Sequence, residues 1–274
     1  MKVEQRMKND LPSSAEPVRF DAPLTVVIPA YNEAGHIRAT LGVIALSIEQ
    51  FAESYTIIVV DDGSTDDTAA EIRLAAADNA HIRPVCNEQN GGKGSALKTG
   101  VLAAANEGYL AFLDADLDLH PDHLASFYRV LQAQQADAVI GSKMHPDSKL
   151  DYPKSRRWIS TCYYLVLKVL FGLSVHDTQT GVKLFRAEAI HAVMPYILVK
   201  RFAYDIEVLA LLNRRKARIV EAPIELHFQR GTAWNRIRLK DLMQTGWDTL
   251  TVFYRLYILR YYDRAMKAAE HSAR

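Results

Sequence analysis

Three acidic residues follow a short apolar segment with a spacing that could hold a divalent metal ion. Asp114 and Asp116 stand two positions apart, directly after the apolar residues 109–113, and Asp118 extends the series. Two carboxylates at a strand end can converge on one hard cation and leave positions open for phosphate oxygens, which fits Mg²⁺ or Mn²⁺. We therefore predict a metal site at Asp114 and Asp116, with Asp118 as a candidate third ligand. The alternative is a solvated acidic turn, because short acidic motifs often arise by chance.

Two other segments carry groups that could contact a nucleotide. Asp61 and Asp62 precede a Gly-Ser-Thr-Asp turn, and their carboxylates could hydrogen-bond a uracil or guanine ring or a ribose. The alternative is a turn cluster in which Asp66 caps the following helix. Residues 90–97, NGGKGSAL, combine glycines, the cation Lys93 and a predicted helix N-terminus, which together suit a phosphate. The alternative there is an ordinary strand-to-helix loop.

An α/β fold would bring these residues together. Short apolar runs predict strands at 24–30, 56–62, 81–86, 109–116 and 137–143, and helices are expected at 34–51, 66–77, 94–107 and from Pro121 onward. This alternation predicts a doubly wound, mostly parallel sheet, and such sheets bind ligands at the carboxyl ends of their strands. The predicted strand ends carry Asn32 and Glu33, then Asp61 and Asp62, then Asp114 and Asp116.

Composition and missing motifs exclude several classes of protein. The net charge of +1 argues against a protein that binds nucleic acid through phosphate contacts. The first predicted strand ends in PAYNEAG and lacks the GxGxxG and GxxxxGK[ST] patterns of dinucleotide-binding proteins and P-loop NTPases. Cys86 and Cys162 have no metal-ligand spacing and indicate free thiols in a reducing, cytoplasmic compartment. No signal peptide is expected, because no apolar stretch follows the N-terminal Lys and Arg residues. No transmembrane helix is expected either, because the longest apolar run, 162–175, is short and contains Lys168.

Four motifs, in order, resemble those of the family-2 inverting glycosyltransferases, which have a GT-A type fold. They are VVIPAYNE, VVDDGSTD, NGGKGSAL and FLDADLD. The second half is similar to the polyprenyl- and dolichyl-phosphate sugar synthases of that family, through AVIGSK, RRWIS, DTQTGVKLFR, YDIEVL and VEAPIEL, the last of which (220–226) indicates a further strand. The resemblance covers roughly residues 24–260. It implies metal-dependent transfer of a hexose from a nucleotide-sugar, UDP-glucose or GDP-mannose, to a polyprenyl or dolichyl phosphate.

The resemblance also implies roles for individual residues. The nucleotide pocket would be lined by Pro29, Ala30, Asn32, Glu33, Asp61 and Asp62, and the metal would be faced by Asp114, Asp116 and Asp118. Lys143 stands where an arginine is common, and it keeps the charge but not the bidentate geometry. Arg157 and Ser160 match positions that meet the lipid phosphate, and Arg230 matches a basic residue that closes over the diphosphate. Relatives often have Gln in place of Asp118, and many carry C-terminal membrane-spanning helices, which are not expected here.

The acceptor decides whether a general base is needed. A lipid monophosphate is already anionic and needs positioning and charge compensation, which Lys143 and Arg157 could supply. A hydroxyl acceptor would need a base, for which Asp177 and the Asp205/Glu207 pair are candidates; each could equally be structural. A soluble family-2 enzyme with a hydroxyl acceptor is therefore the alternative function. A scaffold protein or a nucleotidyltransferase fits the motifs less well.

Two aromatic and basic segments predict contact with a membrane surface. Residues 158–173 and 242–262 mix Trp, Tyr, Phe and Leu with Lys or Arg, a composition typical of interfacial helices. The alternative is packing on the sheet or on a partner in a homo-oligomer. We expect a mobile N-terminal arm at 1–22, a glycosyltransferase domain at 23–238, and a C-terminal amphipathic helical extension at 239–274, placing the protein on the cytoplasmic face of a membrane.

Overall fold

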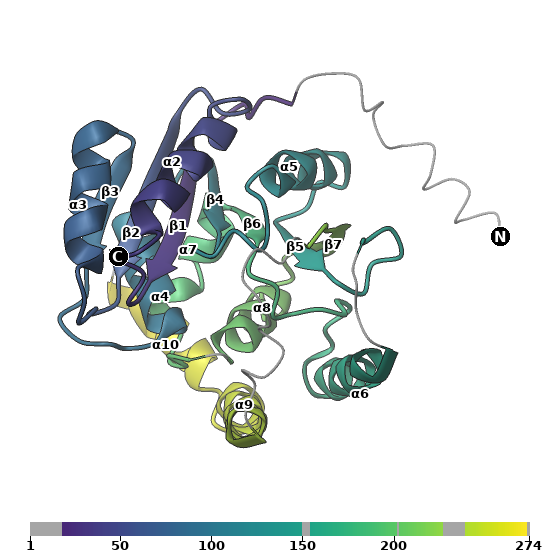
Figure 1. Cartoon of the computed structure of the whole chain (residues 1–274). Helices are drawn as coiled ribbons and strands as arrows, with labels where there is room; N and C mark the ends of the chain where they lie inside the picture. Colours follow the sequence, from purple (N-terminus) through teal and green to yellow (C-terminus); the bar gives the residue numbers. More distant parts are fainter. Residues whose placement is uncertain (1–17, 150–153, 202, 227–238, 273–274) are drawn as a thin grey trace.

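One seven-stranded sheet with helices on both faces forms the body of the protein (Figure 1). The computed structural model describes residues 18–149, 154–201, 203–226 and 239–272, and it describes only the backbone of 154–162, 239–243 and 270. In chain order the strands are β1 (Leu24–Ala30), β2 (Tyr55–Asp61), β3 (Ile82–Cys86), β4 (Tyr109–Phe112), β5 (Ala138–Ser142), β6 (Lys183–Arg186) and β7 (Ile219–Pro223). Across the sheet their order is β3-β2-β1-β4-β6-β5-β7.

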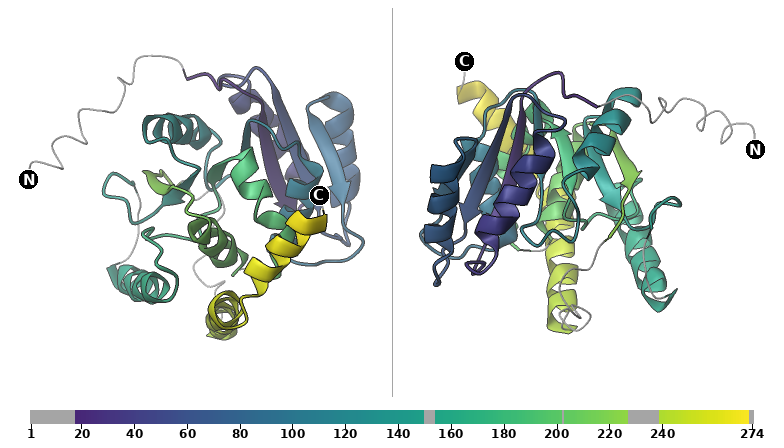
Figure 2. Two further views of the ribbon diagram at one scale, coloured as in Figure 1. Left: turned by 180° about the vertical axis from the view of Figure 1, so that it is seen from behind. Right: turned by 45° about the horizontal axis from the view of Figure 1, so that its top comes forward.

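The helices connect the strands and continue past the last one. They are α2 (Ile37–Ile48), α3 (Thr68–Asp78), α4 (Lys93–Ala103), α5 (His123–Ala133), α6 (Lys154–Phe171), α7 (Ala187–His191), the 3₁₀ turn η1 (Met194–Tyr196), α8 (Tyr204–Arg214), α9 (Leu239–Phe253), the π-helical turn η3 (Tyr254–Ile258) and α10 (Tyr261–Ser272). Figure 2 shows α10 running back along the body from the end of α9. Among the described residues, no helix combines the length and the apolar character that a membrane crossing requires.

The predicted α/β alternation is confirmed, with one strand that sequence patterning missed. Strands β1 to β4 pair in parallel, as predicted, and β5 pairs in parallel with β7. The missed strand is β6, which lies antiparallel between β4 and β5. It has only four residues, too few to show a period. The strand predicted at 109–116 ends at Phe112, and the helix predicted to be capped by Asp66 begins one residue later, after Asp67.

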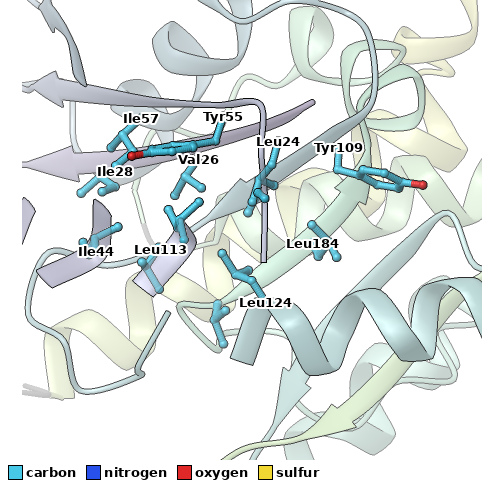
Figure 3. Packing of buried hydrophobic residues seen from close by; sticks show 14 of the residues in the cluster. Leu24, Val26, Ile28, Ile44, Tyr55, Ile57, Tyr109, Leu113, Leu124 and Leu184 are labelled. Carbon is cyan, nitrogen blue, oxygen red and sulfur yellow. The ribbon is translucent and has the colours of Figure 1, made fainter. Parts of the chain in front are cut away.

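Alternate residues of the central strands pack into two separate cores. Val26 and Ile28 of β1 face the cluster under α2 and α5, which Figure 3 shows from close by. Val27, between them, faces the second cluster, which includes residues of α4 and α8. This alternation follows from the two-residue period of a strand, and it explains why β1 is apolar along almost its whole length.

Gly100 of α4 packs tightly against the sheet. A Cβ atom at this position would overlap Val27 and would lie 3.1 Å from Val60 Cγ2. Gly42 in α2 has nothing within 4 Å of the same imaginary atom. Of these two glycines, only Gly100 is required by packing, because a larger side chain there would push α4 away from the strands.

We expect Gly100→Ala to lower the free energy of unfolding by about 1–3 kcal/mol through overpacking. The control Gly42→Ala should raise it, by up to about 1 kcal/mol, because alanine is the better helix former. Urea unfolding of both variants measures the difference. Equal stability of the two variants would contradict the packing described for α4.

Candidate functional site

The three acidic strand ends lie on one edge of the sheet. In the register of β1 with β2, Ala30 is opposite Asp61, and the backbone N–H of Asp62 donates to Ala30 O at 2.8 Å. On the other side of β1, β4 ends opposite Val27, and Leu113 N donates to Val27 O. Asp114 and Asp116 therefore leave the sheet beside β1, the strand that is followed by Asn32 and Glu33.

Asp114 is held by groups from two other parts of the chain. Lys93, the first residue of α4, places Nζ 2.5 Å from Asp114 Oδ1, and both side chains are about 30% exposed, at 28% and 30%. Gly181 lies against the same carboxylate so closely that any Cβ there would overlap it. The 177–181 segment thus passes over the acidic strand end, which explains a glycine in the DTQTG motif.

The charges at this strand end influence one another strongly. Burial by itself would lower the pKa of Lys93, but Asp114, Asp205 and Asp116 outweigh it, so the net shift of that pKa is upward. For Asp116, burial and then the neighbouring Asp114 carboxylate raise the pKa to about 6. Asp116 Oδ1 accepts the N–H of Asp118, and Asp116 forms no salt bridge within the described part of the chain. It is a partly buried carboxylate without a cation of its own.

A second ion pair lies buried behind the first. Lys183 of β6 is 1% exposed, and its Nζ lies 2.6 Å from Asp205 Oδ1 and donates to Thr180 O at 2.6 Å. Asp205 is 7% exposed and Glu207 is completely buried. The sequence reasoning named Asp205 and Glu207 but missed Lys183. The signal was available, since a lysine inside the apolar run VKLF must find a buried partner.

Asp61 and Asp62 are both buried and both bond to the protein itself. Asp61 Oδ1 accepts from the N–H and the hydroxyl of Ser64. Asp62 accepts from Asn87 Nδ2 at 2.7 Å and from the N–H groups of Gly91 and Gly92 at 3.2 and 2.7 Å. These contacts order the turn and the NGGK loop, so two of the loop amides predicted to suit a phosphate already have a partner.

The residues after β1 form a tight turn against the β2–α3 loop. Asn32 has a left-handed backbone with φ of 54°, and its Oδ1 accepts from Thr65 N at 2.9 Å. Glu33 N donates to Thr68 Oγ1 at 2.7 Å. Pro29 is half-buried and Ala30 is buried within the end of β1. A left-handed non-glycine conformation at a site is strained backbone held by its surroundings.

Lys143, which follows β5, is oriented by Asp177. The Lys143 N–H donates to Asp177 Oδ2 at 3.0 Å, and its Nζ lies 3.8 Å from the same oxygen. Asp177 N donates in turn to Glu221 Oε1 at 3.1 Å. The 177–181 segment therefore contacts Lys143 at one end and Asp114 at the other, which brings a cation and the acidic strand end to opposite ends of one short segment.

The remaining predicted site residues are placed less fully. Arg230 lies outside the described residues, and Arg157 and Ser160 lie in the part of α6 that is described by its backbone alone. In the described part of the chain, no three His, Cys, Asp or Glu side chains converge to hold a metal ion, and the role of Asp118 as a third ligand stays a prediction. Two carboxylates still fit Mg²⁺ or Mn²⁺, because such ions commonly complete their shell with substrate phosphates and water.

Comparison with known sequences gives a consistent family. Residues 25–194 match the model of the family described as Glycosyl transferase family 2. The chain is 32% identical to the dolichyl-phosphate beta-glucosyltransferase of Saccharomyces cerevisiae over 74% of this chain and 66% of that protein. It is 30% identical to the undecaprenyl-phosphate mannosyltransferase of Micrococcus luteus, over 72% and 81%. The chain spans only part of the length of its curated relatives. It covers 66% of the yeast protein, and it covers 38% and 64% of two others.

Comparison with solved structures supports the architecture. Glucosyl-3-phosphoglycerate synthase from Mycobacterium tuberculosis, solved with Mn²⁺, UDP-glucose and phosphoglyceric acid, superposes with a TM-score of 0.62 at 19% identity. The match covers 85% of this chain and 79% of that one. The GT-A type of α/β fold predicted from the sequence is thereby confirmed.

The raised pKa of Asp116 gives a prediction about stability. A carboxyl group whose pKa is higher in the folded than in the unfolded protein destabilises the fold when it is ionised. For Asp116 the destabilisation grows as the pH rises from the ordinary pKa of 3.8 to the folded-state pKa of about 6, and it is complete above that. We expect Asp116→Asn to stabilise the metal-free protein by about 1 kcal/mol at pH 7.5, after allowance for solvent screening, and to have little effect near pH 4.

The measurement is urea unfolding of both proteins at the two pH values in chelator. Asp147→Asn, at a side chain that is 78% exposed, is the control and should give the same small difference at both. A destabilised Asp116→Asn protein at pH 7.5 would show that the carboxylate is satisfied in the fold.

Proposed function

Since the chain belongs to glycosyl transferase family 2, we propose that it transfers a hexose from a nucleotide-sugar to a polyprenyl phosphate with the help of a divalent metal ion. The observation that carries the proposal is the pair Asp114 and Asp116 at the carboxyl edge of the sheet, with Asp116 lacking a cation of its own in the described structure. Both curated relatives named above act on a polyprenyl-type phosphate, as their names state.

The carboxylates and the lysines have complementary tasks in this reaction. Asp114 and Asp116 would hold Mg²⁺ or Mn²⁺, which when bound neutralises the charge that grows on the leaving diphosphate. Lys93 keeps Asp114 in place and adds a positive charge beside the same group. Asp61 and Asp62 order the turn and the NGGK loop, so their contribution to nucleotide binding acts through the shape of those loops as well as through direct contact.

The surroundings of Lys143 favour a phosphate acceptor over a hydroxyl. Asp177 accepts the Lys143 N–H and is only 12% exposed, so its carboxylate is engaged in orienting a cation. The other candidate bases are engaged too, because Asp205 pairs with Lys183 and Glu207 accepts three hydrogen bonds. An anionic acceptor needs no base and gains from a cation at Lys143, with Arg157 as a second candidate.

We expect Lys143→Ala to raise the KM for polyprenyl phosphate about ten- to a hundredfold and to leave hydrolysis of the donor by water largely intact. The reason is the loss of a charge-assisted contact at a partly desolvated site, which contributes about 1.5–3 kcal/mol. The assay incubates protein with labelled UDP-glucose or GDP-mannose and a polyprenyl phosphate, and extracts the product into organic solvent. Lys267→Ala, at an exposed lysine on α10, is the charge-matched control.

The hydroxyl-acceptor alternative expects the reverse. Lys143→Ala would then have little effect, whereas Asp177→Asn would abolish transfer in a pH-dependent manner through loss of a base. Glycosylation of a water-soluble alcohol, with no product on any lipid phosphate, would overturn the proposed acceptor and leave only the glycosyltransferase assignment.

We also propose that α6 and α9 bring the protein to the surface of an anionic membrane. The two helices lie side by side, since Tyr163 and Thr249 share a hydrogen bond of 3.0 Å and both helices occupy the lower end of the molecule in Figure 1. Val169 is 84% exposed, Trp247 70% and, in the following turn η3, Ile258 61%. Exposed cations stand close to them in the sequence, at Lys168 and Arg260. Apolar and aromatic side chains flanked by cations suit the headgroup region of a bilayer.

The double change Val169→Ser with Trp247→Ser should weaken binding to vesicles that contain an anionic lipid by about tenfold or more, because two apolar side chains no longer leave water. Co-sedimentation with the vesicles measures this. Leu46→Ser removes a side chain that is 66% exposed on α2 and should leave binding unchanged. Equal binding by all three proteins would rule out this surface.

A further inference from the structure

The C-terminal helix α10 carries a completely buried tyrosine that hydrogen-bonds in the interior, besides the ion pair of its Asp263 with Arg214 of α8. Tyr262 is completely buried, and its O–H donates to Glu207 Oε1. Glu207, in the first turn of α8, is also completely buried. A buried carboxylate destabilises the fold unless its oxygens accept hydrogen bonds, so each hydrogen bond to Glu207 contributes to the stability of the folded protein.

The second oxygen of Glu207 holds the segment that precedes α8. Glu207 Oε2 accepts from Leu198 N at 2.9 Å and from Val199 N at 2.7 Å. A carboxylate can accept at both oxygens at once, whereas the amide of glutamine can accept at only one. Glu207 can therefore connect α10 on one side with residues 198 and 199 on the other.

The same segment presses on the first turn of α4. Lys200 O accepts from Ser95 N at 3.2 Å, and a Cβ added to Gly94 would lie 2.9 Å from Val199 O. Farther along α4, Lys98 Nζ donates to the carbonyl oxygens of Pro195 and Ile197, both at 2.8 Å. Residues 195–200 are thus held between Glu207 and α4, and α4 begins with Lys93, which pairs with Asp114.

We propose that Tyr262 and Glu207 are positioning residues for the donor site. Through the 195–200 segment they fix the first turn of α4, and with it the Lys93 side chain that holds Asp114. The C-terminal helix is accordingly a support of the metal and nucleotide site, although it lies outside the sheet that forms that site (Figure 2). The effect on donor binding rests on the proposed function, whereas the effect on the segment and on α4 does not.

Hydrogen–deuterium exchange measures the support directly. Tyr262→Phe keeps the ring and removes only the hydroxyl, so we expect amide exchange in residues 195–201 and 93–100 to rise about tenfold, as one charge-assisted hydrogen bond is lost. Tyr261→Phe, at the neighbouring residue that is 42% exposed, is the matched control and should change neither segment. Glu207→Gln should fall between Tyr262→Phe and the wild type, because the remaining oxygen can accept the two N–H groups and the amide N–H can donate to the Tyr262 oxygen, while the charge is lost.

Binding and kinetics extend the test to the site. With Mn²⁺ present, Tyr262→Phe should raise the KM for the donor several-fold and change kcat less, because it disturbs a binding surface. A rise in exchange spread evenly over the chain, or no rise in the two segments relative to Tyr261→Phe, overturns the proposal. The proposal is also overturned if exchange rises in the two segments but the affinity of Tyr262→Phe for Mn²⁺, UDP and GDP equals that of the wild type. If the wild type binds neither nucleotide, the proposed donor fails, and exchange in residues 93–100 alone decides the positioning role.

Discussion

Carboxylates gathered at the carboxyl edge of a sheet repel one another, and each needs a compensating group. Asp114 is compensated by Lys93 from α4, and Asp205 by the buried Lys183 from β6. Asp61 and Asp62 are satisfied by hydroxyl and N–H groups of the loops that follow. Asp116 has burial and a like charge beside it, which raise its pKa to about 6. In the proposed function, a divalent cation completes the balance of charge at this edge and also neutralises the leaving diphosphate.

The compensating groups come from distant parts of the chain, and this explains which features sequence reasoning could reach. The range of β1 was predicted correctly because its apolar run is continuous. The position of Asp114 and Asp116 at a strand end followed from the apolar residues before them. The four-residue β6 was missed because a strand that short has no readable period and its antiparallel pairing depends on partners far away in sequence.

The partners of individual site residues were likewise beyond reach of local pattern. Nothing near Lys93 in the sequence indicates that it meets Asp114, and nothing near Gly181 indicates that its missing side chain makes room for that carboxylate. The same holds for Glu207, which looked like half of an acidic pair and is instead the acceptor for Tyr262 and two amides. Such long-range contacts run from Tyr262 of α10 through Glu207 and residues 195–200 to α4, whose Lys93 pairs with Asp114.

The most direct test of the central claim is the metal dependence of transfer, measured as labelled hexose that enters organic solvent with a polyprenyl phosphate. The wild type should be active with Mn²⁺ or Mg²⁺ and inactive in EDTA. Asp116→Ala should be nearly inactive with either metal, because neutralising the leaving diphosphate is an effect of several kcal/mol. Full activity in EDTA, or a fully active Asp116→Ala protein, would contradict a metal site at Asp114 and Asp116 and would require another source of charge for the leaving group.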